Sequence, residues 1–294
     1  MKKITYILLL TISFSLGSCI RDKVEPCLPL QVNITVKDKN YFNVDKVQQE
    51  ERKNENLAFK EYVPTLYYIL RDAATGKVVE EQGVFDVAGS GTTFPVTFCD
   101  CIPHGKYVLT VWGGLKDNPS SSDPLTAVLH AENKEGTDIY MTNDTLVYDA
   151  WNYNYTVDME RVKGKLIIEV EDLPDDVNYS DKTVGGLYKN MNFEFKYSEG
   201  TFVYSQNEWQ PSSDIVTKTL LAPSQAEKGS AVHVNFYDRA DRVTPTLTPG
   251  DVNVTMKRNE LTVLKYVYVG GKKDFLIYIL VNDEWEMLHN MDID

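Results

Sequence analysis

The sequence has 294 residues, 43% of them hydrophobic, and carries a formal net charge of −13 at pH 7. This acidic balance argues against a nucleic-acid-binding protein, which needs clustered Lys and Arg, and it favours solubility. The length is sufficient for two β-domains of ordinary size.

The first 18 residues have the features of a secretory signal peptide. Two lysines precede an apolar stretch at residues 4–16, which is too short to span a bilayer. The following Leu16-Gly17-Ser18-Cys19 resembles the signal box of bacterial lipoproteins, which implies cleavage before Cys19 and acylation of that cysteine, for example by palmitate. An ordinary secreted protein with a cysteine near its cleavage site is the alternative. Each buried methylene contributes about 0.8 kcal/mol, so stable anchoring takes more than one acyl chain.

Residues 19–29 predict a lipidated tether, because they combine charged residues with two prolines and cannot bury an apolar face. Residues 30–36 alternate between apolar and polar side chains and predict a half-buried strand. Residues 38–60 are mostly polar and charged. We expect them to form a long surface loop with at most one helical turn, of the kind that is often functional.

The first half of the chain continues with short alternating segments separated by turn residues. Weak helical spacing is found only at residues 125–131. The predicted strands are residues 62–70, 78–79, 92–98, 106–112 and 137–149.

A second unit begins near Glu160 with the apolar, β-branched run at residues 165–170. Ser198-Glu199-Gly200 lies between two strand-like segments, 191–197 and 201–204, and predicts a hairpin turn. Gly270-Gly271 predicts the tight turn between the last two strands. The remaining predicted strands are residues 215–221, 231–237, 252–256, 261–269 and 275–281.

Many short alternating segments without a long helical period are typical of antiparallel β-sandwiches. We therefore predict an all-β protein with two tandem sandwich domains of about seven strands each. The predicted boundaries are 30–158 for the N-terminal domain and 159–294 for the C-terminal domain.

Three cysteines remain besides Cys19. Cys99 and Cys101 lie two residues apart at a predicted strand end, too far apart for an easy bridge to each other. An oxidising cell envelope favours one disulfide, between Cys27 and either Cys99 or Cys101, with the third thiol left over. A metal site is the competing interpretation, but these thiols match no usual zinc spacing.

Several segments together resemble the minor fimbrial lipoproteins of Bacteroidales, which anchor fimbriae to the outer membrane. The segments are the signal box, Cys27-Leu28-Pro29, the turn at residues 68–77, the run at residues 102–113, and the second-domain opening at residues 161–166. The resemblance implies two transthyretin-like β-domains, no enzymatic activity and no cofactor. It also implies a surface-exposed, lipid-anchored position at the base of a fimbrium, with fimbrillin subunits as partners.

A sheet edge offers unpaired backbone groups that another chain can complete, so β-strand complementation is a suitable way to hold a fimbrillin. The sequence does not identify the open edge.

Enzymatic and metal-binding sites are not indicated by the sequence. It has neither a Gly-x-Ser-x-Gly elbow nor a phosphate loop. Four widely separated histidines do not match a metal-ligand spacing, and we expect structural roles for them. They are His104, His130, His233 and His289.

The tryptophans raise an alternative function, glycan binding in a polysaccharide-uptake system, through sugars stacked on exposed rings. We expect Trp112 in the core and Trp151 as the ring with the greatest exposure. Two or three coplanar exposed rings in one groove would favour glycan binding, whereas an open apolar sheet edge or groove would favour the fimbrial anchor.

Overall fold

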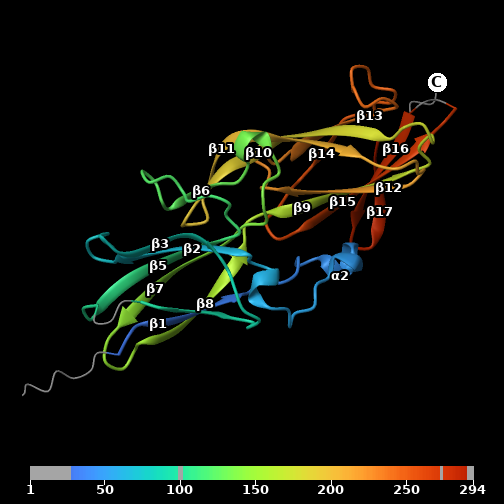
Figure 1. Cartoon of the computed structure of the whole chain (residues 1–294). Coiled ribbons are helices and arrows are strands. Elements are labelled where there is room, and N and C mark those ends of the chain that lie inside the picture. Colours follow the sequence, from blue (N-terminus) through green and yellow to red (C-terminus); the bar gives the residue numbers. More distant parts are fainter. Residues whose placement is uncertain (1–27, 99–101, 272–273, 290–294) are drawn as a thin grey trace, which may run out of the picture.

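The computed structural model describes residues 28–98, 102–271 and 274–289. Strands are the main secondary structure of these residues and helices are few and short, which confirms the predicted all-β class (Figure 1). The strands are β1 (Gln31–Val36), β2 (Thr65–Asp72), β3 (Val78–Asp86), β4 (Phe94–Thr97), β5 (Gly105–Gly113), β6 (Thr126–Val128), β7 (Tyr140–Tyr148), β8 (Asn154–Arg161), β9 (Gly164–Glu171), β10 (Tyr179–Asn192), β11 (Tyr197–Glu208), β12 (Ile215–Leu221), β13 (Ser230–Tyr237), β14 (Val252–Val254), β15 (Leu261–Val269), β16 (Asp274–Val281) and β17 (Glu284–His289).

Among the described residues, helical structure is confined to short segments: α2 (Val44–Val47) and the 3-10 turns η1 (Gln49–Glu51), η2 (Phe59–Glu61) and η3 (Ala131–Asn133). None of the helices in the described part of the chain has the length and apolarity that crossing a bilayer requires.

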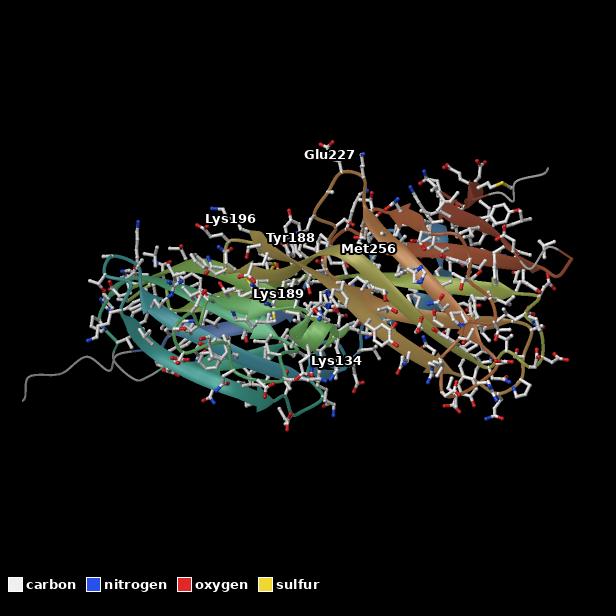
Figure 2. The ribbon with its side chains drawn as sticks, turned by 90° about the horizontal axis from the view of Figure 1, so that it is seen from above. Lys134, Tyr188, Lys189, Lys196, Glu227 and Met256 are labelled. Carbon is white, nitrogen blue, oxygen red and sulfur yellow. The ribbon has the colours of Figure 1, made fainter. Side chains whose placement is uncertain are left out.

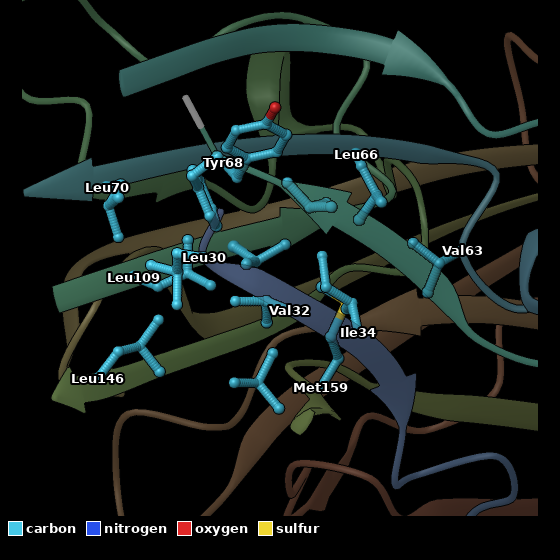
Figure 3. Close-up of a cluster of buried hydrophobic side chains, with 14 of the residues drawn as sticks. Leu30, Val32, Ile34, Val63, Leu66, Tyr68, Leu70, Leu109, Leu146 and Met159 are labelled. Carbon is cyan, nitrogen blue, oxygen red and sulfur yellow. The ribbon is translucent and has the colours of Figure 1, made fainter. Parts of the chain in front are cut away.

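The N-terminal half forms one seven-stranded sheet in the order β3-β2-β5-β7-β8-β1-β4. Its pairings are antiparallel except for β1 and β8, which run parallel. Alternate residues of β1 are buried, as the sequence predicts, and they meet the buried faces of β2, β5 and β7 across the curled sheet. Figure 3 shows this core, with Leu30, Val32 and Ile34 facing side chains from the other strands.

The C-terminal half is a sandwich of two five-stranded sheets around a second core. One sheet has the order β11-β10-β13-β14, with β6 added beside β10, and the other has the order β12-β9-β15-β16-β17. Strand β6 comes from the first half of the sequence but pairs with Asn190–Asn192 of β10. Hence the two halves share a sheet, and the boundary placed between residues 158 and 159 stays a prediction.

The segment at residues 38–60 differs from the long surface loop that the sequence predicts. Tyr41, Val44 and Phe59 are buried, the first two against the start of β15 and Ile167 of β9. The Asn43 side chain reproduces a strand pairing, because its Nδ2 donates to Leu261 O and its Oδ1 accepts from Leu261 N, both at 2.9 Å. We call residues 38–60 the strap, since they tie the N-terminal half to the C-terminal sheet.

The hairpin predicted at Ser198-Glu199-Gly200 is wrong, because these residues lie inside β11. The turn is formed instead by residues 193–196, where Asn192 Oδ1 accepts hydrogen bonds from the backbone N–H groups of Glu194 and Lys196, both at 3.0 Å. Figure 2 shows Tyr188 and Lys196 near the middle of the molecule, where this hairpin reaches the N-terminal half.

The crossing from β8 to β9 joins the halves through buried charged side chains. Arg161 contacts Asp138 and Tyr140 of the N-terminal half and Asn259 of the C-terminal half. Burial by itself would lower the pKa of Arg161, but the nearby Asp138 carboxylate and the two tyrosines Tyr140 and Tyr41 raise it above its ordinary value. The guanidinium therefore stays charged inside the junction.

Lys163 and Gly164 complete this crossing. Lys163 is fully buried, and its Nζ donates to Leu129 O and Glu135 O, both at 2.7 Å. A Cβ on Gly164 would lie 2.3 Å from Lys257 O, so only glycine allows this approach of two backbones. The sequence run at residues 161–166 thus encodes the packing of one half against the other.

Candidate functional site: the groove between two sheet edges

The seven-stranded sheet ends in two edge strands, β3 and β4. In the described part of the chain, β3 pairs with β2 alone and β4 pairs with β1 alone. Each strand therefore has one side without a neighbouring strand, and an edge of this kind is a template for pairing with another chain.

The curl of the sheet brings the two edges to face each other. The ring centroids of Phe85 in β3 and Phe94 in β4 lie 5.7 Å apart. Tyr68 of β2 lies beneath them, in edge-on contact with Phe85 at 6.4 Å and with Phe98 at 5.5 Å. These aromatic pairs hold the edges close without backbone hydrogen bonds between them.

A groove of about 450 Å³ runs between the two edges. None of its lining side chains is charged, and most of them are apolar or aromatic. They are Tyr68, Gln82, Phe85, Phe94, Pro95, Val96 and Thr97. An apolar groove between two open strand edges suits an extended peptide, since alternate side chains enter the groove while the backbone pairs with the edges.

The two edges differ in what they offer an added strand. β3 has nine residues and contains no proline. β4 has four residues, and Pro95 within it cannot donate a backbone hydrogen bond. We therefore expect the longer ladder to form on β3, with β4 closing the other side.

Carboxylates of β3 bind two tyrosines of β2: Tyr68, which lines the groove, and Tyr67, which packs on the opposite face of the sheet. Tyr67 OH donates to Glu81 Oε1 at 2.8 Å, and Tyr68 OH donates to Glu80 Oε1 at 3.3 Å. Burial raises the pKa of Tyr67, and its hydrogen bond to Glu81 raises it further, so the phenol remains protonated. The acidic side chains on β3 favour a strand that carries a basic residue opposite them.

The cysteines predicted from the sequence lie outside the described residues. Cys19 and Cys27 belong to residues 1–27, and Cys99 and Cys101 belong to residues 99–101. The lipidation of Cys19 and the disulfide choices among the other three therefore stay predictions.

The histidines are dispersed. His104 lies in the turn before β5 and His233 in β13. His130 is buried, with Nε2 accepting from Ala222 N at 2.9 Å, and burial lowers its pKa to about 3. Within residues 28–98, 102–271 and 274–289, no group of three or more His, Cys, Asp or Glu side chains is placed to hold a metal ion.

The tryptophans are also dispersed. Trp112 is fully buried, as the sequence predicts, and Trp209 packs against the C-terminal core. Trp151 is 89% exposed, in the turn between β7 and β8, whereas the partly exposed Trp285 is in β17 of the C-terminal half. These two rings are not in one groove, so they do not form the coplanar platform expected of a glycan site.

The fold is shared with candidate adhesins and polysaccharide-binding candidates from Bacteroides. A candidate adhesin from Bacteroides thetaiotaomicron VPI-5482 superposes with a TM-score of 0.58 over 90% of this chain and 100% of that chain, at 14% identity. Polysaccharide-binding candidates from the same organism superpose with a TM-score of 0.57 over 88% of this chain and 98% of that chain, at 12% identity. At these identities the likeness shows the fold alone.

The fimbrial anchor protein Mfa2 from Porphyromonas gingivalis is also among the structural neighbours. The superposition covers 89% of this chain and 100% of the Mfa2 chain at 12% identity, with a TM-score of 0.49. No protein-family model matches the sequence, and no match to it is found among the curated proteins.

Proposed function

We propose that this chain is a lipid-anchored outer-membrane subunit that attaches a fimbria to the cell surface by binding a fimbrillin strand in the groove between β3 and β4. The observation that carries the proposal is that two open strand edges face each other across an apolar groove. Such a groove accepts a strand without any change in the order of the existing strands.

Recognition divides between backbone and side chains. Hydrogen bonds to β3 and β4 supply affinity, and the aromatic floor formed by Tyr68, Phe85 and Phe94 selects the side chains that enter. The partner is bound and not chemically converted, so the proposed function is not enzymatic.

The groove and the predicted lipid anchor belong to the same sheet, which suits a protein that bears a pulling force. Strand β4 pairs directly with β1, and the predicted tether leads into β1. Force applied at the groove therefore passes through this sheet to the lipidated end without crossing the junction between the two halves.

Site-specific photo-crosslinking tests the groove. A photoreactive residue at Gln82, which is exposed and lines the groove, should capture a fimbrillin in whole cells. Gln206 provides a matched control, because it is an exposed glutamine on another edge strand, β11. Capture of fimbrial subunits at Gln82 and not at Gln206 supports the proposal, whereas equal capture at both, or none at Gln82, contradicts it.

The lipid anchor is tested separately. Mass spectrometry of the mature amino-terminal peptide should find acyl chains on Cys19. Cys19→Ser should release both the protein and its fimbriae from the membrane. Retention of normally attached fimbriae by Cys19→Ser would contradict the anchoring role.

A further inference from the structure

The turn between β7 and β8 presents an indole ring to the surroundings. Trp151 is 89% exposed, although tryptophan is among the side chains that gain most from leaving water. The turn is well defined, because Asp149 Oδ1 accepts from the backbone N–H groups of Trp151 at 2.8 Å and Asn152 at 2.9 Å. The backbone of the turn therefore places Trp151 at the surface of the molecule.

The described chain begins beside this turn. Tyr148, the last residue of β7, donates its hydroxyl to Leu28 O, and Gln31 N donates to Tyr153 O at 2.7 Å. The entry of the chain into β1 is thus bonded to residues on both sides of Trp151. Figure 1 shows β1 and β8 at this end of the molecule, with the C-terminus at the opposite end.

The segment between the predicted lipidation site and this turn is short. Residues 19–27 can span at most about 30 Å, because an extended chain covers 3.3–3.6 Å per residue. An acyl group on Cys19 therefore keeps the β7–β8 end within that distance of the lipid surface.

The charges at this end do not oppose contact with lipid. The β2–β3 turn and the start of β5 adjoin each other, since Ala73 N donates to Lys106 O at 2.9 Å. They expose Lys77 and Lys106, which balance the turn-capping carboxylates of Asp72 and Asp149. These four charges therefore cancel, in a chain whose formal net charge is −13.

We propose that the β7–β8 end rests on the membrane, with the Trp151 ring in the headgroup region of the lipid. The proposal rests on the proposed acylation of Cys19. Indole rings favour the membrane interface, where the apolar ring meets lipid and the N–H remains hydrogen-bonded. Trp151 gives the protein a second lipid contact, so the molecule stands on the surface in one orientation with its C-terminal half pointing away.

Tryptophan quenching tests this orientation. The acylated full-length mature protein is reconstituted into phosphatidylethanolamine–phosphatidylglycerol vesicles with or without brominated acyl chains. Subtracting the emission of Trp151→Phe from that of the wild type isolates Trp151, and Trp285→Phe isolates Trp285 in the same way. Brominated lipid should reduce the Trp151 emission at least twofold and leave the Trp285 emission unchanged.

Flotation of the same vesicles separates this proposal from the anchor itself. A protein that floats with the vesicles but has an unquenched Trp151 overturns the orientation and leaves the anchor standing. A protein that carries no lipid, does not float and shows no quenching overturns both. Quenching of Trp285 to the same extent as Trp151 also overturns the proposed orientation.

Discussion

Nε of Arg161 donates to Asp138 Oδ2 at 3.0 Å, and the Arg161 side chain is only 2% exposed. The same guanidinium donates to Asn259 Oδ1 at 2.7 Å and lies over the Tyr41 ring, 4.1 Å from its centroid. One side chain therefore connects the N-terminal sheet, the strap and the C-terminal half.

Replacing Arg161 by methionine should strongly destabilise the protein. Removing one partner of a buried ion pair leaves the other charge uncompensated, at a cost of about 3–5 kcal/mol. Because Asp138 is 25% exposed, we expect a loss near the lower end of this range, measured as the free energy of unfolding in urea. Arg239→Met is the control: Arg239 is exposed, so its replacement should change the free energy by less than about 0.5 kcal/mol. Equal stability of the two variants would contradict a structural role for the junction.

Asn43→Ala should loosen the strap without unfolding the sandwich. The substitution removes two hydrogen bonds to Leu261, each with a net contribution of about 1 kcal/mol. Hydrogen exchange at the Leu261 amide should become faster, while exchange in the centre of β5 should not change. Unchanged exchange at Leu261 would mean that the Asn43 hydrogen bonds do not hold the strap, and that its apolar contacts and the ion pairs of Glu51 are sufficient.

Lys182 should make the free energy of unfolding depend on pH in the alkaline range. Its side chain is 2% exposed with one long hydrogen bond, 3.4 Å to Thr217 Oγ1, and burial lowers its pKa from 10.5 to about 8. Between about pH 8 and pH 10.5 the unfolded chain binds a proton at Lys182 that the folded chain does not, so the free energy of unfolding rises with pH.

The measurement for Lys182 is a series of urea midpoints from pH 7 to 10 for the wild type and for Lys182→Met. The methionine variant should be the more stable at pH 7, because it buries no charge. The difference in the free energy of unfolding between Lys182→Met and the wild type should narrow as the pH rises, by at most about 1.4 kcal/mol per pH unit. A difference that does not change with pH would contradict the lowered pKa.

Local patterns in the sequence predict many of the strands, but not β8, β17 or most of β10, and the weak helical spacing at residues 125–131 falls on strand β6. The alternation around Trp112 correctly predicts β5, with the ring in the core. Residues 38–60 carry no comparable period, because Tyr41, Val44 and Phe59 are anchored individually by partners far away in the chain. Their burial is therefore not visible in local patterning.

Pairing between distant segments also limits prediction of the candidate site. Phe85 and Phe94 are close in sequence, but the edges that they occupy are set by the order of all seven strands. The predicted position of the hairpin turn is wrong because it is based on a local turn motif alone. Ser198-Glu199-Gly200 has suitable turn residues, whereas the cap supplied by Asn192 places the turn earlier in the chain.

Backbone hydrogen exchange in the presence of purified fimbrillin tests the central claim most directly. Amides of β3 and β4 should become protected when the fimbrillin binds, because an added strand satisfies the open edges, and those of the edge strand β11 should not change. Binding of fimbrillin with unchanged exchange in β3 and β4 would contradict strand complementation in this groove.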